Sequence, residues 1–189
     1  LYRRTGNTAE MVEEYLKFGL DNEDREYVQA IWQNKLKDEK EGAALEEALD
    51  QKVQQVPIEA YFNEILRWHL IQEKEFFKAF VQERAMDRRY KNEGNRMMDL
   101  GFVAIQNKDY VNGGKAFEYL VKEYPKNANY PLWRRMLINA KEEVVKNTFP
   151  VNKDDIRLLI NEYQKLFEEL GMNQKTLEGL RNTAQLYAF

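Results

Sequence analysis

Apolar and polar residues alternate along most of the chain with the period of an α-helix. The clearest stretch follows Pro150, where one helical face carries only apolar side chains: Ile156, Leu159, Tyr163, Leu166, Phe167 and Leu170. Asn152 or Asp154 can cap the start of this helix, and Gly171 can end it. Similar stretches, separated by short polar turns, predict an all-α chain of about ten helices.

The helical stretches repeat along the sequence. Residues 71–76 resemble residues 105–110, and the equivalent positions Glu75 and Asp109 are 34 residues apart. The helix-breaking residues agree, because Pro57 and Pro125 are 68 residues, or two such periods, apart. A fixed period of this length indicates stacked units of two antiparallel helices, since one unit alone leaves apolar surface bare.

This period predicts a single repeat domain over residues 1–189. Its parts are a half repeat (1–22), three repeats (23–57, 58–91 and 92–125), a divergent repeat (126–171) and a C-terminal capping helix (172–189). We expect the polar turn at 21–24 to cap a helix, because it lacks the glycine and the final glutamate of a calcium loop.

The repeat at 92–125 carries the most distinctive residues. Gly101 and Gly113 let its two helices approach closely, Leu100 and Phe117 fill the space beside them, and Pro125 ends the second helix. With these residues the repeat resembles the tetratricopeptide repeat (TPR) family, and the other repeats resemble it more weakly. The resemblance implies a right-handed superhelical solenoid of antiparallel helix pairs. It also implies a bacterial protein with further repeats, of which this chain, opening without Met, would be the C-terminal part.

Composition narrows the possible functions. Charged residues make up 32% of the chain and the net charge is −3, so we expect no nucleic-acid partner. The chain has no cysteine, which excludes disulfides and thiolate chemistry. Apolar runs are too short to cross a bilayer, so we expect no membrane insertion. The sequence does not identify the cellular compartment, although the absence of cysteine and the resemblance slightly favour an extracytoplasmic, periplasmic location.

The sequence offers little for catalysis. We expect His69, the single histidine, to be structural, on a helix surface or beside Trp68, because one histidine without cysteine cannot make an ordinary zinc site. Adjacent acids such as Glu142 and Glu143 point about 100° apart on a helix, so we expect most of them on solvated faces. Phosphate-binding loops and nucleophile elbows are absent from the sequence. We therefore expect no enzyme activity, no cofactor and no metal.

The resemblance implies that the first helix of each pair lines a concave, ligand-binding face. By register, the candidate binding residues are Tyr27, Tyr61, Glu64, Trp68, Gln72, Asn95, Met98, Phe102 and Gln106. Aromatic anchors with polar neighbours are typical of peptide-binding grooves. The same spacing also suits packing between neighbouring first helices, so both interpretations stay open. The predicted function is a non-catalytic scaffold that binds a protein or an extended peptide. The alternative is an architectural segment whose concave face is covered by its own chain or by self-association.

Overall fold

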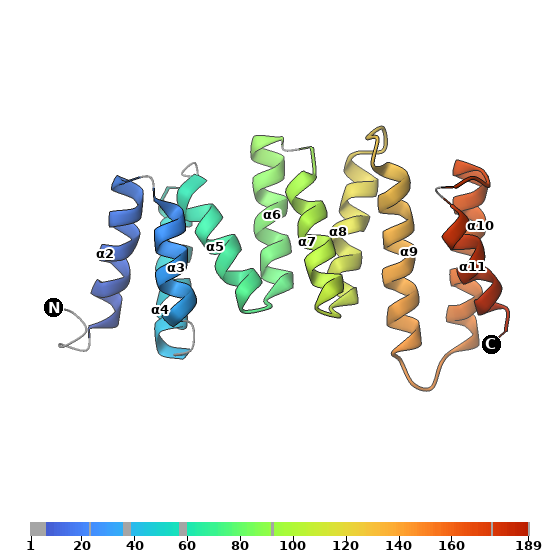
Figure 1. Ribbon diagram of the computed structural model, residues 1–189, viewed down its shortest axis with the longest axis horizontal. Coiled ribbons are helices and arrows are strands. Elements are labelled where there is room, and N and C mark those ends of the chain that lie inside the picture. The colour runs from blue at the N-terminus through green and yellow to red at the C-terminus, as the bar shows by residue number, and fades with distance from the viewer. Residues whose placement is uncertain are drawn as a thin grey trace. The chain divides into compact units, whose positions relative to one another are not determined.

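The computed structural model describes residues 7–22, 24–35, 39–56, 60–91, 93–174 and 176–188. Over these ranges the chain forms ten helices and no strands, which confirms the predicted all-α class and number of helices (Figure 1). The chain divides into two compact units, Leu1–Glu75 and Phe76–Phe189. Each unit is described by itself.

The first unit contains four helices. They are α2 (Thr8–Asp21), α3 (Arg25–Lys35), α4 (Glu39–Gln55) and α5 (Ala60–Gln72). Helix α2 packs against α3 and α4, α4 packs against α5, and α3 also packs against α5. The core between them holds large side chains with no exposed surface, among them Leu16, Trp32 and Leu49. Burying each of these residues stabilises the unit by roughly 1.5–3 kcal/mol.

Local signals explain where these helices begin. The side chain of Asn7 accepts a hydrogen bond from the backbone N–H of Glu10, and the side chain of Asp24 accepts one from the N–H of Tyr27. The turn before α3 therefore caps a helix, as predicted. The predicted stop at Pro57 lies outside the described residues.

His69 is buried in this unit, so it does not lie on the helix surface, which was one of the two expected positions. Its Nε2 atom is 3.6 Å from a carboxylate oxygen of Glu46, so the side chain joins α5 to α4. The imidazole has a structural place between two helices, where a polar group needs a partner because burial removes it from water.

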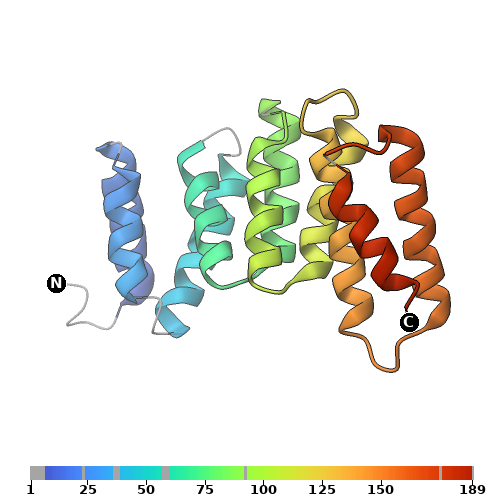
Figure 2. The same cartoon turned by 45° about the vertical axis from the view of Figure 1, so that its right-hand side comes forward.

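The second unit contains six helices. They are α6 (Phe76–Tyr90), α7 (Asn95–Gln106), α8 (Tyr110–Glu123), α9 (Tyr130–Lys146), α10 (Lys153–Leu170) and α11 (Leu177–Leu186). Consecutive helices pack against one another, and α6 also packs against α8. Figure 2 shows α11 lying alongside α10. Three predicted helix ends are confirmed: Asn152 caps α10, Gly171 follows it, and α8 ends two residues before Pro125.

The close contact of α7 and α8 follows from the predicted glycines. A Cβ atom added to Gly101 would lie 2.9 Å from the Phe117 ring, and one added to Gly113 would lie 2.6 Å from Ile105. These distances are shorter than carbon–carbon contact, so the two glycines leave the room that the Phe117 and Ile105 side chains need between the helices. Leu100 and Phe117 are buried beside them, as expected.

A buried carboxylate on α6 ties three segments of the second unit together. Asp87 is 2% exposed and accepts hydrogen bonds from the hydroxyls of Tyr119 (2.8 Å) and Tyr124 (2.5 Å). It also accepts one from the backbone N–H of Gly94, just before α7. Burial, and then the hydrogen bond to Asp87, raise the pKa of Tyr119 to about 12, so this phenol donates throughout the neutral range.

A second buried carboxylate, Glu142 on α9, joins α9, α10 and α11. It accepts hydrogen bonds from the Tyr163 hydroxyl (2.6 Å) and the Asn182 amide (3.3 Å), and its other oxygen is 2.5 Å from Lys146 Nζ. Glu142 has no exposed surface, which corrects the expectation for this acid pair: only Glu143 keeps partial exposure. Burial of this charge is tolerated because polar or charged groups contact both of its oxygens.

Candidate functional site

The nine predicted binding residues occupy three helices. Tyr27 lies on α3, and Tyr61, Glu64, Trp68 and Gln72 lie on α5, all in the first unit. The other four lie on α7 of the second unit: Asn95, Met98, Phe102 and Gln106. Spacings of three and four residues place each set on one face of its helix. All nine side chains keep at least partial exposure.

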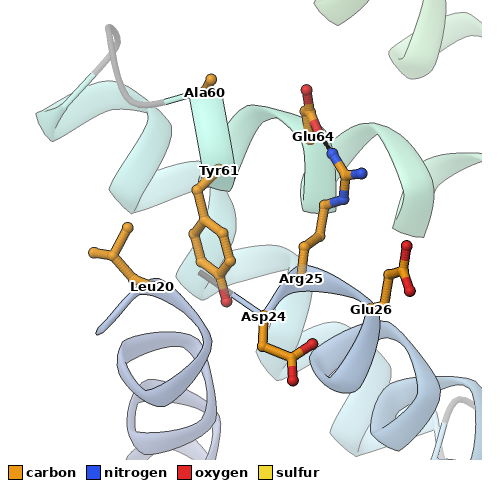
Figure 3. A pocket seen from close by; sticks show the side chains of 7 residues that line it. All are labelled: Leu20, Asp24, Arg25, Glu26, Ala60, Tyr61 and Glu64. Carbon is orange, nitrogen blue, oxygen red and sulfur yellow. Dashed lines mark ion pairs between the residues drawn. The ribbon is translucent and has the colours of Figure 1, made fainter. Parts of the chain in front are cut away.

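In the first unit, a pocket of about 700 Å³ opens between three helix ends (Figure 3). Its lining comes from the end of α2 (Leu20), the start of α3 (Asp24, Arg25 and Glu26) and the start of α5 (Ala60, Tyr61 and Glu64). The structure thus brings two predicted residues, Tyr61 and Glu64, into one pocket. Tyr27, Trp68 and Gln72 are not part of this lining.

The Tyr61 side chain forms the aromatic wall of the pocket. Figure 3 shows its ring extending from α5 toward the turn that carries Asp24. Gly19 makes this position possible, because a Cβ atom there would collide with the Tyr61 hydroxyl. Burial, and then the negative charge of Asp24, raise the pKa of Tyr61 to about 12. The phenol is therefore neutral at physiological pH and faces the pocket as a polar ring.

Charged side chains also line the pocket. Arg25 on α3 makes an ion pair with Glu64 on α5, which joins the two helices across the pocket. Asp24 and Glu26 make no ion pair among the described residues. Helical register does not identify Asp24, Arg25 and Glu26, because they lie in or beside the turn between α2 and α3. Four acids among the six residues from Asp21 to Glu26 are the signal that could have indicated a charged site there.

The candidate residues on α7 have different surroundings. Phe102 makes an edge-to-face contact with Phe117, with the ring centroids 5.2 Å apart, so part of its surface belongs to the core between α7 and α8. Met98 is also partly exposed, and Asn95 and Gln106 are exposed at the two ends of the helix. On this helix the two apolar residues lie between polar ones.

The second unit also has a groove of about 400 Å³ that the sequence did not indicate. It lies mainly between α8 and α9, where Val111, Leu137 and Val144 supply apolar surface and Lys115 and Lys141 supply charge. No predicted site residue lines it. Its residues lie on α8, α9 and α10, outside the three helices that carry the predicted binding residues.

No family model matches the chain, and no curated protein matches it. The chemical possibilities therefore rest on the described side chains. Among the residues that the structure describes, no group of histidine, aspartate or glutamate residues could hold a metal ion. None of the described helices is long and apolar enough to cross a membrane. The partly exposed aromatic, aliphatic and polar side chains described above can instead make contacts with another polypeptide.

Proposed function

We propose that this chain is a non-catalytic scaffold that binds a protein or an extended peptide along the first helices of its helix pairs. One observation carries the proposal: apolar side chains at the register positions of three such helices remain partly exposed. Tyr27, Trp68 and Met98 represent the three helices, and Tyr27 is 46% exposed. The exposed Gln72, Asn95 and Gln106 flank them. Aromatic anchors surrounded by hydrogen-bonding groups are what peptide recognition requires.

The proposal includes a TPR-like architecture, a right-handed superhelix of helix pairs. In such a stack each helix packs on its counterpart in the next pair. Within the units, α2 packs against α4, α3 against α5, and α6 against α8, which supports this arrangement. The starts of the first helices support it too: α3, α5, α7 and α9 begin at Arg25, Ala60, Asn95 and Tyr130, in steps of 35 residues, one residue longer than the period in the sequence.

A selection with random peptides tests the proposal whatever the sequence of the partner. The full chain is immobilised and challenged with a phage-displayed random-peptide library, and enriched peptides are labelled and measured by fluorescence anisotropy. We expect Trp68→Ala or Met98→Ala to weaken binding of an enriched peptide about tenfold or more, because truncating an anchor removes at least about 1.4 kcal/mol. Phe102 is a poorer probe, since its truncation would also disturb the core.

The matched control is Phe77→Ala. Phe77 lies on α6, a second helix, and is 52% exposed, so its truncation removes a similar surface outside the candidate row. The proposal fails if no peptide is enriched, or if Phe77→Ala weakens binding as much as Trp68→Ala. Thermal unfolding of each variant separates the architectural alternative. A large drop in the midpoint for Trp68→Ala and Met98→Ala, without any peptide binding, would assign these side chains to packing.

A further inference from the structure

The pocket between α2, α3 and α5 has a charge that selects its occupant. Among the described residues that line it, Asp24, Glu26 and Glu64 bring three negative charges, and Arg25 brings one positive charge, which leaves a formal charge of −2. Helix ends modify this sum. The starts of α3 and α5 each add about half a positive charge, and the end of α2 adds about half a negative charge. The pocket therefore keeps an excess of about 1.5 negative charges.

The surrounding unit reinforces this sign. Residues 1–75 contain 10 Lys and Arg against 17 Asp and Glu, a formal charge of −7. Residues 76–189 contain 19 Lys and Arg against 15 Asp and Glu, a formal charge of +4. The net charge of −3 is thus the sum of a negative first unit and a positive second unit. The field of the first unit attracts cationic groups and speeds their approach.

The walls of the pocket suit a long cationic side chain. Leu20 and Ala60 give aliphatic surface for its methylene groups, and the Tyr61 ring offers a face to its charged end. Asp24 and Glu26 supply carboxylates that make no ion pair among the described residues. A volume of about 700 Å³ leaves room for such a side chain together with part of its backbone.

We infer that this pocket receives a lysine or arginine side chain of a basic polypeptide segment that binds along α3 and α5. The inference rests on the proposed function, because Tyr61 and Glu64 belong both to the pocket and to the candidate row. It adds a partner class: the bound segment carries positive charge at the place where it meets the starts of these two helices.

The test measures binding of a labelled peptide of alternating lysine and serine to the full chain by fluorescence anisotropy. Asp24→Asn removes charge but keeps a good helix cap, and Glu26→Gln keeps the shape of the side chain. We expect each to weaken binding about threefold and the pair about tenfold, as for partly exposed ion pairs. The control pair Glu14→Gln and Glu47→Gln removes the same charge from exposed sites on α2 and α4, and we expect a smaller loss.

A variant that is expected to increase affinity controls for loss of folding. Arg25→Gln removes the positive charge among the described lining residues, so we expect it to tighten binding about threefold, which unfolding cannot produce. Affinity should also fall as ionic strength rises from about 0.05 to about 0.5 M. A peptide of alternating glutamate and serine should not bind.

Several results would overturn the inference. The first two are an equal loss of affinity in the control pair and no gain of affinity from Arg25→Gln. The others are binding of the glutamate peptide, and displacement of the lysine peptide by free spermidine as effectively as by unlabelled peptide. If library peptides still depend on Trp68 and Met98 while Asp24 and Glu26 have no effect, the inference fails and the proposed function stands. If no library peptide depends on Trp68 or Met98, the proposed function itself fails.

Discussion

Replacing Asp87 by alanine tests the buried network that joins α6, α7 and α8. The carboxylate accepts three hydrogen bonds, from Tyr119, Tyr124 and the N–H of Gly94. Alanine leaves these three donors without their acceptor inside the second unit. Asp87→Asn is the gentler comparison, because the amide keeps one acceptor oxygen and nearly the same shape.

The structure sets the size of the expected effect. Hydrogen bonds to a charged group contribute about 1.5–3 kcal/mol each, so three bonds give an upper limit of about 9 kcal/mol. Two terms reduce this limit. Alanine also removes the desolvation penalty of the buried carboxylate, and the half-buried Tyr124 hydroxyl can turn toward water. We therefore expect Asp87→Ala to lower the free energy of unfolding by about 3–5 kcal/mol and Asp87→Asn by about 1–2 kcal/mol.

Urea denaturation followed by far-ultraviolet circular dichroism measures these losses, with both transitions fitted if the two units unfold separately. A double-mutant cycle with Tyr119→Phe isolates the Asp87–Tyr119 hydrogen bond. Once Asp87 is replaced, Tyr119→Phe has no hydrogen bond to this carboxylate left to remove. The double variant should therefore lose less stability than the sum of the two single variants. Strict additivity, or a loss below about 1 kcal/mol for Asp87→Ala, would refute the assigned network.

Three further predictions concern the second unit. The pKa of Tyr119 is about 12 in the fold against 10.0 in the unfolded chain, so the free energy of unfolding should fall as the pH rises from 10 to 12. The fall should be less steep in Tyr119→Phe. Urea titrations that give both proteins the same dependence of stability on pH would contradict this. Glu142→Ala should lower the free energy of unfolding in urea by about 2–4 kcal/mol, and a loss as small as that of Glu143→Ala would argue against its buried role. Gly101→Val should lower the thermal midpoint and destabilise by about 1–3 kcal/mol, because its side chain meets the Phe117 ring; an unchanged midpoint would contradict the close packing.

Much of the fold could be predicted because its signals are local. Helical periodicity, the cap at Asn152, the stop at Gly171 and the end of α8 before Pro125 depend on residues close together in sequence. The glycine contacts between α7 and α8 were also predictable, since Gly101 and Gly113 lie only 12 residues apart in the sequence. The number of helices follows from the same local signals.

The buried carboxylates could not be predicted in this way. Asp87 finds its hydroxyl partners 32 and 37 residues later, and Glu142 finds Asn182 40 residues later. Acidic side chains usually lie at the surface, and residue type alone does not identify the exceptions.

The candidate site was predictable only in part for a related reason. Tyr61 and Glu64 were found because they lie on a helix with a clear register. The Asp24 turn was predicted only as a helix cap, since its role in a pocket depends on how α3 meets α5. Helix ends that converge from different parts of the chain leave no periodic signal in the sequence.

The Glu142 cluster has a consequence for how the second unit opens. A helix with few packing neighbours is a common starting point for local unfolding, and α11 packs mainly against α10. Here, release of α11 would take the Asn182 amide away from both Glu142 and the Tyr163 hydroxyl. That loss makes partial opening unfavourable, so the amide hydrogens of α11 should exchange with solvent almost as slowly as those of α10. The two helices would then behave as one cooperative unit that protects this part of the chain from proteases.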